Sequence, residues 1–92
     1  AYYRIGKVST GFEVWISNSQ FNDDYTQYQA EIAFDDSTVP HQRTILVCMN
    51  PEKDYQVTFN GKVVESKTYH QGLLEITLPS TNKSGKLTVT SV

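Results

Sequence analysis

The chain of 92 residues has the length of one small domain, and its composition excludes two classes of partner. Lys and Arg number 8 against 10 Asp and Glu, so the net charge is −2 and the pI is near 5.5. This balance leaves no basic excess for nucleic acid or for an anionic membrane surface. The sequence also lacks an apolar stretch of about 18 residues, which a transmembrane helix requires. We expect residues 1–92 to form a single domain of a larger multimodular protein.

The first third of the chain predicts three strands, at Tyr2–Val8, Phe12–Ser17 and Tyr25–Phe34. In the second and third, apolar and polar residues alternate, which is typical of strands with one face on a core. The predicted core face comprises Phe12, Val14 and Ile16, and then Tyr28, Ala30, Ile32 and Phe34. The opposite face comprises Glu13, Trp15 and Ser17, and then Gln27, Gln29, Glu31 and Ala33.

The polar segment Asn18–Asp24 predicts the loop that joins the second and third strands. A hairpin across this loop would pair residues whose numbers sum to about 42–44. Trp15 would then lie opposite Gln27–Gln29 on the polar face of the hairpin. We therefore expect the indole ring and these amide side chains to share one surface.

The stretch Arg43–Met49, with five consecutive apolar residues at Ile45–Met49, predicts the central strand of the fold. It lies between Pro40 and Pro51 and is apolar at odd and even positions alike. A strand of this kind has no solvent side, so we expect both of its faces to be covered. The predicted core brings Val47 together with Ile32, Val57 and Ile76.

The second half of the chain predicts four more strands, at Tyr55–Phe59, Lys62–Ser66, Leu73–Leu78 and Lys86–Ser91. Between the first two, Asn60-Gly61 is a strong signal for a type I′ hairpin turn, in which both residues take positive φ. A two-residue turn would place Thr58 opposite Val63, and Val57 opposite Val64.

These patterns together predict an all-β domain. Seven to eight short strands follow one another at spacings of roughly 10–13 residues, and turn residues separate them. Such spacing indicates an antiparallel β-sandwich of the immunoglobulin-like or jelly-roll-like kind.

Trp15 breaks the pattern of its own strand, because it is a large aromatic residue on an otherwise polar face. A flat ring beside amides and carboxylates suits sugars, since the ring covers the C–H face of a pyranose while Gln and Glu bind its hydroxyls. The candidate site comprises Trp15 as the platform, Glu13, Gln27 and Gln29 as hydroxyl partners, and Tyr25 and Arg43 at the rim. Two alternatives stay open. The ring is covered by a neighbouring loop or another domain, or a bulge shifts the alternation by one and buries it.

Other reactive side chains form no catalytic or metal-binding pattern in the sequence. His41 and His70 lack a second His or Cys at metal-ligand spacing. Cys48 lies in the apolar strand, where a buried hydrophobic residue is expected. Asp23-Asp24 and Asp35-Asp36 are typical of turns, with a Ca²⁺ site as the alternative. We predict a domain that is not an enzyme, with no cofactor and no metal other than that alternative.

The last 40 residues or so combine a hairpin with two amphipathic strands. Tyr55–Glu65 contains the Asn-Gly turn, Gly72–Pro79 is an amphipathic strand ended by proline, and Gly85–Val89 closes the pattern. The arrangement resembles the accessory β-sandwich modules of bacterial glycoside hydrolases and polysaccharide lyases. This resemblance implies a non-catalytic carbohydrate-binding module, secreted or at the cell surface, that directs a parent catalytic domain to a β-glucan or hemicellulose. The alternative is an immunoglobulin-like structural or protein-interaction domain without glycan binding.

Overall fold

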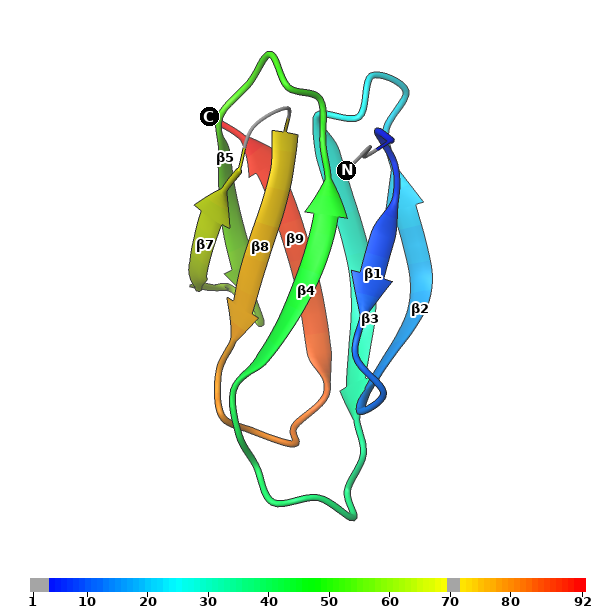
Figure 1. The fold of residues 1–92 in the computed structure, drawn as a ribbon, viewed down its shortest axis with the longest axis vertical. Coiled ribbons are helices and arrows are strands. Elements are labelled where there is room, and N and C mark those ends of the chain that lie inside the picture. Colours follow the sequence, from blue (N-terminus) through cyan, green and yellow to red (C-terminus); the bar gives the residue numbers. More distant parts are fainter. Residues whose placement is uncertain (1–3, 70–71) are drawn as a thin grey trace.

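The computed structural model describes residues 4–69 and 72–92, which form two antiparallel sheets packed face to face (Figure 1). The four-stranded sheet has the order β1-β4-β8-β7, and the five-stranded sheet has the order β2-β3-β9-β5-β6. The strands are β1 (Val8–Thr10), β2 (Val14–Phe21), β3 (Gln27–Phe34), β4 (Arg43–Cys48), β5 (Tyr55–Phe59), β6 (Lys62–Val63), β7 (Glu65–Thr68), β8 (Leu73–Leu78) and β9 (Gly85–Ser91). The predicted antiparallel β-sandwich is confirmed.

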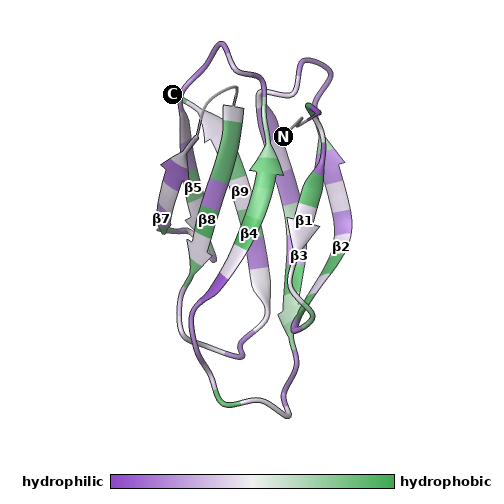
Figure 2. Cartoon of the chain, in the orientation of Figure 1, coloured by the Kyte–Doolittle hydropathy of each residue, from purple (hydrophilic) through white to green (hydrophobic). Residues whose placement is uncertain are grey.

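The core lies between the two sheets and is built from the inward half of each alternating strand. Strand β3 shows this most clearly, because its buried and exposed residues alternate along its whole length. Figure 2 shows apolar and polar bands alternating along the strands of both sheets. The core comprises Val14, Tyr28, Ala30, Ile32, Phe34, Ile45, Val47, Met49, Val57, Phe59, Leu74, Ile76, Leu78, Leu87 and Val89. The predicted grouping of Val47 with Ile32, Val57 and Ile76 is therefore confirmed.

Strand β4 lies inside its sheet, where it pairs with β1 on one side and β8 on the other. The expectation that both of its faces are covered holds only at its C-terminal end. There Val47 faces the core and Cys48, on the opposite face, is also buried. Thr44 is exposed and Leu46 is half-buried, because the outer face of a two-sheet sandwich has no third layer over it.

Strand boundaries differ from the sequence prediction at several points, which include the first strand and the predicted return strand. The first described strand is Val8–Thr10 and not Tyr2–Val8, of which Tyr2 and Tyr3 lie outside the described residues. The predicted return strand Lys62–Ser66 is divided at Val64, so the described residues form nine strands. Its first part, β6, pairs with β5, whereas β7 pairs with β8 in the other sheet.

The Asn60-Gly61 hairpin is confirmed. Asn60 has φ 54° and Gly61 has φ 80°, as a type I′ turn requires. Thr58 pairs with Val63, and the Val64 amide donates a 3.0 Å hydrogen bond to the Val57 carbonyl oxygen.

The predicted inward position of Phe12 is wrong. Strand β2 begins at Val14, and Phe12 lies before it in a turn in which the Val14 amide donates to the Gly11 carbonyl oxygen at 3.4 Å. The turn carries the Phe12 side chain out of the alternation, and the ring is fully exposed.

Candidate functional site on the outer face of the five-stranded sheet

Trp15 lies on the outer face of the five-stranded sheet, in its edge strand β2. Its side chain is 65% exposed, whereas its neighbour Val14 is buried in the core. The alternation predicted for this part of β2 is therefore present, and the alternative of a core tryptophan is excluded. Trp15 pairs with Ala33 of β3, which has a small side chain.

The predicted pairing of Trp15 with Gln27–Gln29 is wrong. Strand β2 continues to Phe21, and a bulge between Ser17 and Gln20 shifts the register. Asn18 takes φ 51° at this bulge. Beyond the bulge Gln29 pairs with Gln20. Gln29 precedes Ala33 by four residues, so Trp15 and Gln29 lie about 13 Å apart along the sheet.

The short loop between β2 and β3 is held together by the side chain of Asn22. The Asn22 Oδ1 atom accepts hydrogen bonds from the backbone amides of Thr26 at 2.9 Å and Gln27 at 3.0 Å. Just before the loop, Phe21 packs on Tyr28, with ring centroids 4.5 Å apart. The first four residues of the predicted loop Asn18–Asp24 therefore belong to strand β2.

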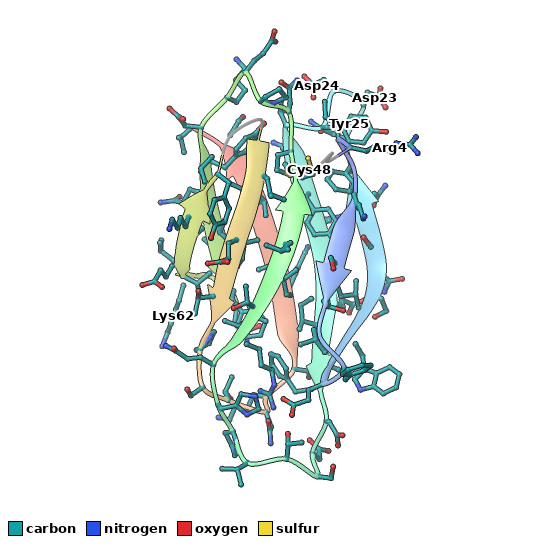
Figure 3. The ribbon with its side chains drawn as sticks, viewed as in Figure 1. Arg4, Asp23, Asp24, Tyr25, Cys48 and Lys62 are labelled. Atoms are coloured by element: carbon teal, nitrogen blue, oxygen red, sulfur yellow. The ribbon has the colours of Figure 1, made fainter. Side chains whose placement is uncertain are left out.

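Tyr25 belongs to this loop and lies far from Trp15. Figure 3 shows Tyr25 beside Asp23 and Asp24 at one end of the sandwich, and Figure 1 shows that β2 begins at the other end. Its ring packs on Phe21 at 5.3 Å between centroids. The structure therefore does not place Tyr25 at the rim of a site centred on Trp15.

Two rows of amide and hydroxyl side chains cross the outer face of the same sheet. Cα pairing between neighbouring strands sets these rows. The first row comprises Gln20, Gln29, Thr88 and Thr58, and the second comprises Gln27, Thr90 and Gln56. We call these seven residues the amide–hydroxyl rows. Gln27 and Gln29 were predicted from the sequence, and the other five were not.

The signal that could have found four of the five missing residues is the alternation of β5 and β9, whereas the fifth, Gln20, lies beyond the bulge in β2. In β9, for example, Leu87 and Val89 are buried, so Thr88 and Thr90 must face outward. The sequence does not reveal that β9 lies between β3 and β5, and that order is what brings these side chains beside Gln27 and Gln29.

The outer face is shallowly hollowed in two places that follow one another along β3. A depression of about 380 Å³ is lined by Gln20, Phe21, Asn22, Gln27, Tyr28, Gln29, Thr88 and Thr90. A second, of about 390 Å³, is lined by Ser17, Glu31, Ile32, Ala33, Ser84, Gly85 and Lys86. Ala33, which pairs with Trp15, lines the second depression.

This face carries little charge. Across the five strands of the sheet, the charged residues are Glu31, Lys62 and Lys86. Glu31 pairs with Lys86 and accepts a hydrogen bond from the Asn18 amide. The amide–hydroxyl rows themselves contain no charged residue.

Glu13 and Arg43 form part of a cluster at one end of the sandwich. Arg43 is only 6% exposed, so it is not the rim residue that was predicted. Its Nε donates to Glu13 Oε2 at 3.2 Å, and its guanidinium also bonds the Thr81 carbonyl oxygen at 2.7 Å and Asn82 Oδ1 at 2.8 Å. Glu13 Oε2 also lies 2.8 Å from His41 Nε2. The Glu13 carboxylate therefore already has partners within the domain, Arg43 and His41.

The two aspartate pairs cap turns. Asp24 Oδ1 accepts a 2.7 Å hydrogen bond from the Thr26 hydroxyl, and this bond lowers the pKa of Asp24. The Ser37 hydroxyl bonds Asp35 Oδ1 at 2.6 Å and lowers the pKa of Asp35 in the same way. Among the described residues, no group of three or more His, Cys, Asp and Glu side chains is arranged to hold a metal ion. His70 lies outside those residues.

Comparisons with protein-family models, with curated proteins and with solved structures find no match for this chain. In the described part of the chain, no helix has the length and apolar character needed to cross a membrane.

Proposed function

We propose that this domain binds a polysaccharide without cleaving it, and that Trp15 is the stacking platform. The observation that carries the proposal is the exposure of the Trp15 ring, 65%, on a sheet face that is mostly polar. An exposed indole offers a flat apolar surface for the C–H face of a sugar ring. The amide–hydroxyl rows on the same face offer donors and acceptors for sugar hydroxyls.

The distribution of carboxylates on this face favours binding over hydrolysis. Most glycoside hydrolases need two carboxyl groups that flank the scissile bond. The five strands of this sheet contribute one, Glu31, and it already accepts a hydrogen bond from Asn18. In this proposal the domain, secreted or at the cell surface of a bacterium, holds a catalytic domain of the same protein on a β-glucan or hemicellulose.

The test compares the parent domain with Trp15→Ala in affinity gels containing mixed-linkage β-glucan, arabinoxylan or galactomannan. Loss of one stacked ring should weaken binding by roughly one to two decades. The stability of the variant should stay within about 1 kcal/mol of the parent, because the ring lies outside the core. The matched control is Val63→Ala, which removes an exposed apolar side chain at the opposite edge of the same sheet. The proposal fails if none of the three gels retards the parent domain, or if Trp15→Ala is retarded equally.

A structural or protein-interaction domain is the second candidate, and the exposure of Phe12 favours it. Phe12 is fully exposed and Val39 is 80% exposed. The contact between Glu13 and His41 brings their two loops together at one end of the sandwich. If this end docks on another domain, Phe12→Ser should lower the melting temperature of the full-length protein and leave that of the isolated domain unchanged. Under the glycan-binding proposal, Phe12→Ser should change neither.

A further inference from the structure

We infer that the amide–hydroxyl rows form a second part of the binding site, and that the ligand is an uncharged glycan chain long enough to reach from these rows to Trp15. This inference rests on the proposed function and adds to it the class and minimum length of the ligand. It also assigns to binding five residues beyond the sequence prediction, namely Gln20, Gln56, Thr58, Thr88 and Thr90.

The first step of the argument is the regular spacing of the rows. Neighbouring strands lie about 4.8 Å apart, and outward residues of one strand lie about 7 Å apart. Gln29 therefore stands beside Thr88, and Gln27 beside Thr90, as the strand pairing requires. Each amide and each hydroxyl can both donate and accept. A glycan hydroxyl has the same dual character, so the rows match a polyhydroxylated chain without needing a fixed donor pattern.

The second step is that most of these polar atoms are available to a ligand. In the described part of the chain, the side chains of Gln27, Gln56, Thr58, Thr88 and Thr90 make no hydrogen bond to another residue. Within the rows, one such bond runs from Gln29 Nε2 to Gln20 Oε1 at 3.3 Å. A ligand hydroxyl would therefore replace water and would not have to break protein contacts.

The third step concerns charge. A chain of uronic acids or sulfated sugars would bring repeated negative charges, which bind well only where Arg or Lys can pair with them. The rows hold no cation, and on the neighbouring row Lys86 and Glu31, one positive and one negative, lie opposite one another in the strand pairing. Because the rows offer an anionic chain no Arg or Lys, an uncharged chain suits them better.

The fourth step sets the length of the ligand. Ala33 lies opposite Trp15, and Gln27 lies six residues earlier in β3. This separation corresponds to about 20 Å along the strand. The two depressions of the face cover this span. One sugar stacked on Trp15 cannot reach the rows, so the rows should contribute only when the chain is several sugars long.

The experiment measures binding of a length series, from disaccharide to octasaccharide, prepared from β-glucan, xylan and galactomannan. The parent domain is compared with a Thr88→Val, Thr90→Val double variant and with Gln29→Ala. Val keeps the shape of Thr and suits a strand, so the fold should persist. The matched control is Thr44→Val, an exposed Thr on the outer face of the other sheet. Polygalacturonate serves as the anionic probe.

We expect the affinity of the parent domain to rise with chain length up to about 20 Å of glycan. The double variant should bind the octasaccharide about tenfold more weakly, because two hydrogen-bonding hydroxyls are lost. Its binding of the disaccharide should be unchanged. Gln29→Ala should likewise bind the octasaccharide more weakly and the disaccharide equally well. The control Thr44→Val should bind both as the parent does. Polygalacturonate should not be retained.

Two results would overturn the inference and leave the proposed function intact. One is octasaccharide binding that depends on Trp15 but is unaffected in both row variants. The other is retention of polygalacturonate as strong as that of the neutral chains. By contrast, failure of the parent domain to bind any neutral chain removes the proposed function, and the inference with it.

Discussion

Arg43 shows how burial changes the role of a charged residue. We predicted that Arg43 lies at the rim of the candidate site, but its guanidinium is enclosed among three segments of the chain. It bonds Glu13 before β2, Thr38 in the loop after β3, and Thr81 and Asn82 in the loop after β8. It also lies over the Phe34 ring, 4.5 Å from the centroid. One side chain therefore ties together the loops at this end of the sandwich.

Replacing Arg43 with Met should destabilise the domain by about 3 kcal/mol. The variant removes one partner of a buried hydrogen-bonded pair and leaves the acceptors of Thr81 and Asn82 without their donor. Arg43→Lys should recover only part of this loss, because an ammonium cannot reproduce the planar fork of donors. The urea unfolding midpoint is the measurement. A midpoint equal to that of the parent for Arg43→Met would mean that the cluster contributes nothing to stability.

Cys48 provides a second prediction, about chemical reactivity. The side chain is 1% exposed, and burial raises the pKa of its thiol above the usual value. Because the thiolate is the reactive form, the folded protein should react much more slowly with an aromatic disulfide reagent at pH 8 than the urea-unfolded protein does. The rate should increase in step with unfolding as urea is added. Rapid and complete labelling of the folded protein in buffer would contradict the burial of this residue.

The β2–β3 hairpin shows what the sequence can and cannot predict about an element. The faces of β3 followed from its alternation, because each buried position is occupied by an apolar residue. The register did not follow. Asn18 and Ser19 are typical turn residues, yet in an edge strand they fit a bulge that faces solvent. The packing of Phe21 on Tyr28 holds the strand end in place, and this contact depends on the register itself.

The hairpin turn between β5 and β6 gives a prediction at the same scale. Gly61 takes φ 80°, which a β-branched residue adopts only with strain, so Gly61→Val should cost roughly 1–3 kcal/mol. Open space surrounds this glycine, so the loss of stability reflects the strained backbone and not a clash of the new side chain. Gly11→Val is the control, since Gly11 also has open space around it and does not have positive φ. Thermal unfolding should show a lower melting temperature for Gly61→Val alone, and equal values would argue against the type I′ turn.

At the scale of the whole molecule, the pairing of distant segments creates the candidate site. The local pattern predicted strands at β3, β5, β8 and β9 and, for β3, the residues that the strand buries. It did not predict that the chain returns to place β9 between β3 and β5, which brings Gln27, Thr90 and Gln56 into one row. This order depends on how two whole sheets share a core. Trp15 could therefore be found from the sequence, whereas most residues of the amide–hydroxyl rows could not.

The shared core also determines how the molecule responds to a cavity. Val47 is fully buried between the sheets, so Val47→Ala should cost about 2–3 kcal/mol through lost transfer energy and the cavity left behind. For a domain of this size, that loss lowers the melting temperature by on the order of 10–20 °C. Thr44→Ala changes an exposed position of the same strand and should shift the melting temperature little. Because the substitution lies in the core and not on the outer face, glycan retention of Val47→Ala below its melting temperature should equal that of the parent. An unchanged melting temperature would show that β4 is not the central strand of the core.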